Sequence, residues 1–148
     1  MIKKKIFLAA PISGFSKENE YQKYREKVLN LMIYLRKNSF DVYSEVERVT
    51  GKDNYDSPGD SVKEDFKKIN DLDAFLLLHP KKFQTSALIE LGYAYAKEKK
   101  IVIVGPTDVL PYLALGLPLA SSNVSVIDSP DLDVTTFDRV INALNGLD

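Results

Sequence analysis

The chain has 148 residues, enough for one domain that buries well over half of the surface its unfolded form exposes. Its apolar content of 45% and charged content of 28% are those of globular proteins, and its net charge of −1 provides no basic field for a nucleic acid polymer. The absence of cysteine excludes disulfides, thiolate metal sites and a cysteine nucleophile, and a single histidine excludes a histidine-rich metal site.

The first apolar run is short and leads into Pro11 and Gly14, so it indicates a strand and a loop rather than a signal peptide. Nor does any apolar stretch reach the length needed to span a bilayer. We therefore expect a cytoplasmic protein without a membrane partner.

Strand-like and helix-like segments alternate from the start of the chain. Residues 6–10 form a continuous apolar run, typical of a strand buried on both faces, and residues 11–15 follow as a loop. Ser16 is a candidate N-cap for a long helix, because apolar side chains then recur at helical spacing. Residues 40–46 are predicted to form a second strand, and the polar stretch 47–60, rich in glycine and proline, a loop.

The same alternation continues to the end of the chain. Ser61 and Glu64 match a capping box for a short helix that ends near Asn70. A helix is predicted over 85–97, and the basic residues at its end interact favourably with the negative end of the helix dipole. The other predicted elements are strands over 74–78, 101–104 and 123–127, and helices over 108–119 and 135–144.

Five short apolar strands separated by helices predict a single α/β domain, with a doubly wound five-stranded parallel sheet and helices on both faces, of flavodoxin-like or Rossmann-like type. Such sheets bind ligands beyond the carboxyl ends of their strands, near the point where strand order reverses. This rule selects the loops after Ala10, Val46, Leu78 and Val104 as the place of a site. It does not say what the site does.

Two carboxylates stand out by position: Asp65 in the helix before the third strand and Glu90 in the helix after it. Glu90 lies within an apolar run, where a buried carboxylate must be paired, hydrogen-bonded or facing a cavity. The sequence around Glu90 is equally compatible with an exposed position of this residue on an amphipathic helix. For Asp65 the simpler interpretation is an acidic residue that stabilises the start of a helix.

Three segments of the sequence, in this order and spacing, match the pattern of a known family. They are residues 6–14 (IFLAAPISG), Asp65 with Asp73 after it, and residues 86–94 (SALIELGYA). Together they resemble the nucleoside 2-deoxyribosyltransferase superfamily, which includes deoxynucleoside 5′-monophosphate N-glycosidases and CMP hydrolases. The resemblance covers about Lys5 to Val104 and implies one such domain over 1–148. Its implied activity is cleavage or exchange of the N-glycosidic bond of a nucleoside or its monophosphate.

The resemblance also implies roles for individual residues. Glu90 falls on the nucleophile, which attacks the anomeric carbon to form a glycosyl-enzyme, and Asp65 on the carboxylate that manages the proton of the departing base. The implied substrate contacts are Phe7, Ala10, Ser13, Gly14, Gln84 and Ser86. The chemistry needs no metal and no organic cofactor. The family relationship further implies a homo-oligomer, a dimer or a larger assembly, in which neighbouring subunits share active sites.

Several positions depart from the family pattern. Phe7 stands where the family has a phenolic hydroxyl near the nucleophile, and Gln84 where transferases have a sugar-binding Asp and monophosphate hydrolases a phosphate-binding Ser. Ser86 and Leu88 replace glycines, and no C-terminal asparagine matches the one that a neighbouring subunit contributes in transferases. The sequence therefore leaves three questions open: whether the reaction is transfer or hydrolysis, whether the sugar is ribose or deoxyribose, and whether the substrate is a nucleoside or its monophosphate.

Phe7 and Gln84 also support a second hypothesis, a nucleotide-binding or sensing module that has lost turnover. A flavodoxin-like or receiver-like function is disfavoured, because the loop after the first strand carries neither an acidic cluster nor a hydroxyl-rich phosphate cradle. Glu45 ends the second predicted strand, where the family meets its base, and its simpler interpretation is a solvated strand end. His79 is interpreted as a loop histidine rather than a catalytic one, and Asp73 as the structural start of a strand.

Overall fold

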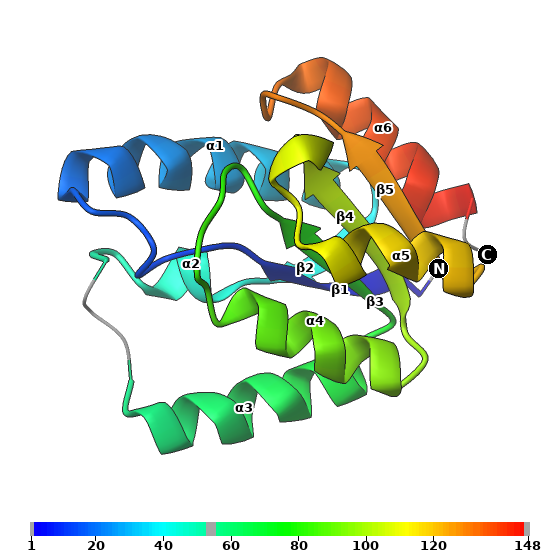
Figure 1. Ribbon diagram of the computed structural model, residues 1–148, viewed down its shortest axis with the longest axis horizontal. Coiled ribbons are helices and arrows are strands. Elements are labelled where there is room, and N and C mark those ends of the chain that lie inside the picture. The colour runs from blue at the N-terminus through cyan, green and yellow to red at the C-terminus, as the bar shows by residue number, and fades with distance from the viewer. Residues whose placement is uncertain (1, 53–55, 147–148) are drawn as a thin grey trace.

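The computed structural model describes residues 2–52 and 56–146, and its centre is a five-stranded sheet in which all neighbouring strands are parallel (Figure 1). Its strand order is β2-β1-β3-β4-β5. The strands are β1 (Lys4–Ala9), β2 (Phe40–Tyr43), β3 (Ala74–Leu78), β4 (Lys100–Gly105) and β5 (Val124–Asp128). The predicted doubly wound α/β architecture is confirmed.

Helices cover both faces of the sheet (Figure 1). One face carries α1 (Glu18–Lys37) and α6 (Val134–Gly146). The other carries α3 (Pro58–Asp71), α4 (Ala87–Ala96) and α5 (Tyr112–Ala120). The short helix α2 (Glu45–Arg48) follows β2 directly, and a 3-10 turn, η1 (Thr107–Val109), precedes α5.

The alternation of side chains along each strand explains the two layers of core. On β1, Ile6 and Leu8 pack with α1 and α6, whereas Phe7 and Ala9 pack with α3, α4 and α5. In β3 every residue from Ala74 to Leu78 is buried, as expected for a central parallel strand. The continuous apolar runs in the sequence are therefore strands that contact helices on both sides.

Three local boundaries differ from the sequence-based expectations, each because another residue provides the cap. Ser16 does not cap α1, since Lys17 holds the N-cap position without a side-chain hydrogen bond. The capping box expected at Ser61 is wrong, because Ser57 caps α3 by accepting a hydrogen bond from the Asp60 amide. The second strand ends early, because Ser44 caps α2.

The segment predicted as one helix over 108–119 is divided in two. Residues before a proline favour extended backbone, and Leu110, just before Pro111, separates η1 from α5 with an extended conformation. Residues 53–55 of the loop expected over 47–60 lie outside the described residues. No helix in the described part of the chain is long and apolar enough to cross a membrane.

The reversal of strand order lies at β1. The chain passes from β1 through α1 to β2 on one side, and then through α3 to β3 on the other. Because these two connections cover opposite faces, the carboxyl ends of β1 and its neighbours border a crevice. The fold thereby places the loop after β1, helix α2 and the ends of α3 and α4 around one space.

Candidate active site

A pocket of about 330 Å³ opens beyond the carboxyl ends of β1 and β2, where the strand order reverses. Its wall combines the end of β1 and the following loop with α2, the first half of α3 and the start of α4. Of the eight residues expected to form the site, six line this pocket: Phe7, Ala10, Ser13, Asp65, Ser86 and Glu90.

Gly14 and Gln84, the other two expected residues, do not line the pocket. Gly14 packs against the ring of Phe83, and a β-carbon at position 14 would stand 3.0 Å from the Phe83 Cδ1 atom. Gln84 is exposed between β3 and α4. Both lie next to residues of the pocket wall, Ser13 and Thr85, but the sequence could not show that these two positions themselves lie outside it.

Helix packing brings the two predicted catalytic residues together. Phe66 follows Asp65 on α3, and its ring stacks on that of Tyr93 from α4 with a centroid distance of 4.1 Å. This contact fixes α3 against α4 on the side of the sheet that carries Phe7. Asp65 and Glu90 consequently approach one another across the two helices and line the same pocket.

The pair is partly removed from water. Oδ1 of Asp65 and Oε2 of Glu90 are buried, and neither has a hydrogen-bond partner within the described residues. Burial, followed by the neighbouring Asp65, raises the pKa of Glu90 to about 9. Burial is also the largest cause that raises the pKa of Asp65, to about 7, and Glu45 adds to it. The two carboxyls therefore retain at least one proton at neutral pH.

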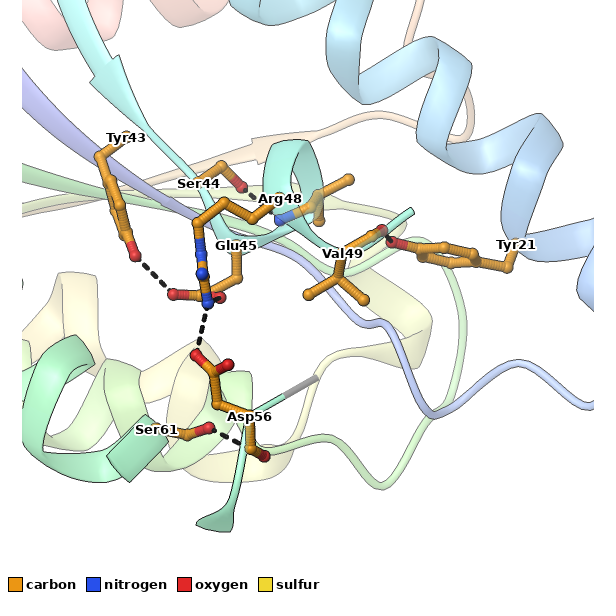
Figure 2. A network of polar contacts seen from close by, with 9 residues as sticks. Tyr21, Tyr43, Ser44, Glu45, Arg48, Val49, Asp56 and Ser61 are labelled. Atoms are coloured by element: carbon orange, nitrogen blue, oxygen red, sulfur yellow. Dashed lines mark hydrogen bonds and ion pairs between the residues drawn. The ribbon is translucent and has the colours of Figure 1, made fainter. Parts of the chain in front are cut away.

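Glu45 is a third carboxylate in the wall of this pocket. Figure 2 shows its side chain between Tyr43 and Arg48. The Tyr43 hydroxyl donates to Oε1 of Glu45 at 2.5 Å, and Nη2 of Arg48 donates to Oε2 at 3.0 Å. The same Arg48 nitrogen donates to Oδ2 of Asp56 at 2.6 Å, which joins α2 to the segment before α3.

The interpretation of Glu45 as part of a solvated strand end is therefore wrong. Glu45 is the first residue of α2, and its side chain is 21% exposed and turns toward α3. Tyr43, Arg48 and Asp56 had not been predicted as residues of the site. The only local signal was the spacing of Glu45 and Arg48, three residues apart, which suits an ion pair on a helix.

Phe7 lies beneath the pocket as an apolar floor. Its ring is buried, stacks on Phe75 at 5.7 Å and lies 5.5 Å from the ring of Tyr43. Phe7 and Tyr43 are direct partners in the pairing of β1 with β2. A phenol absent from β1 is thus present on the adjacent strand, where it contacts Glu45.

The lining has an uneven charge. Its hydroxyl groups come from Ser13, Ser44, Ser61, Thr85 and Ser86. Among the described residues of the wall there is no Lys, Arg or His, whereas four carboxylates are present: Glu45, Asp56, Asp65 and Glu90. Within residues 2–52 and 56–146, no group of three or more His, Cys, Asp or Glu is arranged to hold a metal ion.

Two further residues considered from sequence lie outside this pocket. Asp73 exchanges hydrogen bonds with Lys5, each 2.8 Å long, which supports the interpretation of Asp73 as a structural residue at the start of β3. His79 lies in the loop after β3, as predicted, and is buried there, which lowers its pKa.

Comparison with known proteins shows that solved structures share this fold. The sequence matches no family model and no curated protein. Among solved structures, CMP N-glycosidase BcmB of Clostridium botulinum is similar with a TM-score of 0.72 and 23% identity, covering 93% of this chain and 98% of that one. BlsM has a TM-score of 0.81 and 18% identity, with 99% and 92% coverage.

A third solved structure, a 2-deoxyribosyltransferase of Bacillus psychrosaccharolyticus, has a TM-score of 0.59 and 20% identity, covering 90% of this chain and 95% of that one. The chain therefore shares its fold with a CMP N-glycosidase and a 2-deoxyribosyltransferase. These structures share its sheet and helices over nearly their whole length.

Proposed function

We propose that this protein cleaves or exchanges the N-glycosidic bond of a nucleoside or nucleoside monophosphate through a glycosyl-enzyme on Glu90. The observation that supports this proposal best is the approach of Asp65 and Glu90 within one pocket, where burial raises the pKa of both carboxyls. Two carboxyls that share a proton can supply a nucleophile and an acid at the same time. The fold of known N-glycosidases and deoxyribosyltransferases agrees with this chemistry.

In the proposed reaction, an oxygen of Glu90 bonds to the anomeric carbon while the bond from that carbon to the base nitrogen breaks. The electron pair of that bond goes to the base, and Asp65 gives the base its proton. Water then attacks the anomeric carbon, Asp65 takes a proton from that water, and Glu90 leaves as a carboxylate. If a second base attacks instead of water, the outcome is transfer.

This cycle requires Glu90 ionised and Asp65 protonated when the substrate is bound. The raised pKa values of both groups keep one proton within the pair near pH 7. Because the pKa of Glu90 is the higher of the two, substrate binding has to move that proton from Glu90 to Asp65, beside the departing base. No other described side chain of the wall combines burial with an unpartnered carboxylate oxygen.

The charge of the wall favours a substrate without a 5′-phosphate. The lining contains four carboxylates and, among its described residues, no cation, and the nearby guanidinium of Arg48 is bonded to Glu45 and Asp56. A phosphate would meet net repulsion, whereas the hydroxyls of Ser13 and Ser86 suit a sugar. We therefore infer that an uncharged nucleoside is preferred over its monophosphate.

A panel assay tests the proposed function. The protein is incubated with ribo- and deoxynucleosides and their monophosphates, with and without a second free base, and released or exchanged base is quantified by chromatography. We expect turnover that Glu90→Gln lowers by at least about a thousandfold, since it removes the nucleophile. Glu26→Gln is the matched control, because Glu26 is exposed on α1 and outside the pocket. Turnover that survives Glu90→Gln would contradict the proposal.

The second candidate is a binding module without turnover, which the departures at Phe7 and Gln84 favour. It predicts that a nucleoside raises the melting temperature of the protein while no base is released. Under this alternative, Glu90→Gln would leave both observations unchanged.

We further infer a homo-oligomer assembled through α5. This helix carries no charged residue, and Tyr112, Leu113 and Leu119 on it are exposed, Leu119 to 90%. Light scattering after size exclusion would report a dimer or larger species, and Leu113→Asp would shift it toward monomer. A wild-type protein that is monomeric at assay concentration would contradict this inference.

A further inference from the structure

Glu45 is the pocket carboxylate to which the proposed reaction assigns no step. Unlike Asp65 and Glu90, it is fully engaged, since Tyr43 donates to one of its oxygens and Arg48 to the other. Arginine is a donor only and carries a permanent charge, so the contact with Arg48 places a fixed positive group directly beside the Glu45 carboxylate.

The two donors are themselves held in place. The Tyr43 ring contacts Phe7 at 5.5 Å, and the Nζ atom of Lys68 lies 4.9 Å from its centroid. Arg48 is bonded on its other side to Asp56. The carboxylate of Glu45 consequently has a fixed position between β2, α2 and α3.

Charged and titratable groups near this carboxylate come from several neighbouring elements. From α3 come Glu64, Asp65 and Lys68, and the segment before α3 contributes Asp56. Helix α4 contributes Glu90, while Tyr43 and Arg48 come from β2 and α2. Within this set, the charge of Glu45 raises the pKa of both Asp65 and Glu90.

We propose that Glu45 is a positioning residue for the reaction: fixed in the pocket wall by Tyr43 and Arg48, its carboxylate favours retention of the proton that Asp65 and Glu90 share. This inference rests on the proposed function. Glu45 itself neither gains nor loses a proton during the cycle. The proton moves from Asp65 to the base and returns to Asp65 from water, while the fixed negative charge of Glu45 makes loss of that proton to solvent unfavourable.

The kinetic test is the pH profile of kcat/KM for Glu45→Gln, which removes the charge but keeps the size and an oxygen acceptor for Tyr43. We expect the alkaline limb to move down by about one pH unit, so that activity near pH 8.5 falls about tenfold while activity near pH 5.5 changes little. Glu45→Asp, which keeps the charge, should have an alkaline limb of kcat/KM close to that of wild type.

Glu47→Gln is the matched control on the same helix, because the Glu47 side chain bonds Arg36 on α1 and does not line the pocket. It should leave the limb in place. A Glu45→Gln profile that keeps the wild-type limb, with KM raised for one base only, would show that Glu45 contacts the base and would overturn the proposal.

A second measurement separates this inference from the proposed function. In substrate-free protein, carboxyl carbon NMR signals of Asp65 and Glu90 report their titration without any turnover. Both should titrate at lower pH in Glu45→Gln than in wild type, and Glu45→Ala provides the same test if Glu45→Gln does not fold. Titrations that coincide with wild type would overturn the role of Glu45, whether or not the protein releases base. A shifted titration in a protein without turnover would support the electrostatic role and contradict only the proposed function.

Discussion

Replacing Glu90 by Gln should make the protein more stable at alkaline pH, because the protein buries this carboxyl at a cost. The pKa of Glu90 rises from an ordinary value of 4.5 to about 9 in the folded chain. A raised carboxyl pKa means that the folded state binds the proton more tightly than the unfolded state. Its contribution to stability is therefore complete below about pH 4.5 and is lost as pH rises toward 9.

The size of the effect follows from the same shift. Each pKa unit corresponds to about 1.4 kcal/mol, so the ionised Glu90 lowers the free energy of unfolding by at most about 5 kcal/mol at pH 8.5. The pocket opens to water on one side, which reduces the penalty. We expect about 2 to 3 kcal/mol at pH 8.5, gained by Glu90→Gln relative to wild type, and a much smaller difference at pH 5.

Urea unfolding at these two pH values measures the difference directly. Glu26→Gln serves as control, because Glu26 is exposed on α1 and should respond equally at both pH values. Parallel stability curves for wild type and Glu90→Gln across this range would refute the reasoning, since they would mean that burial does not disfavour the ionised carboxyl.

Three other outcomes are expected. Gly105→Ala should cost at least about 3 kcal/mol or prevent folding, because its β-carbon would stand 2.1 Å from the His79 carbonyl oxygen, whereas Gly92→Ala, with open space around it, should be neutral or stabilising in thermal melts. Tyr21→Phe should lower the free energy of unfolding by about 1 to 2 kcal/mol, since it removes the buried 2.6 Å hydrogen bond to the Val49 carbonyl. Steady-state assays should give kcat/KM at least about tenfold higher for a nucleoside than for its monophosphate; the reverse order would refute the charge argument.

The sheet was predictable because parallel strands leave long apolar runs in the sequence. β3 was placed with its observed bounds, and the other strands differ at their ends. The caps were less predictable, since hydroxyl residues such as Ser16, Ser57 and Ser61 lie close to helix starts and compete for the same role. Which of them bonds a helix amide depends on the path of the whole chain.

The candidate site shows the same division. Position along the chain identified Asp65 and Glu90, but their approach depends on the packing of Phe66 on Tyr93, a contact between different helices. Glu45 was placed at the correct end of β2, yet its part in the pocket depends on a helix that begins one residue earlier than the strand was expected to end. Side-chain direction at a junction between elements is set by tertiary contacts that a periodic pattern does not encode.

All described residues of the pocket wall lie between Phe7 and Glu90, so β4, α5, β5 and α6 support the site without lining it. Substitutions in these last elements should change how much folded protein a cell accumulates rather than the turnover of each folded molecule. In a library that covers every position, abundance and activity should then correlate closely after residue 100 and separate around the pocket. The later elements are accordingly the part of the chain where stabilising changes can be collected with the least risk to catalysis.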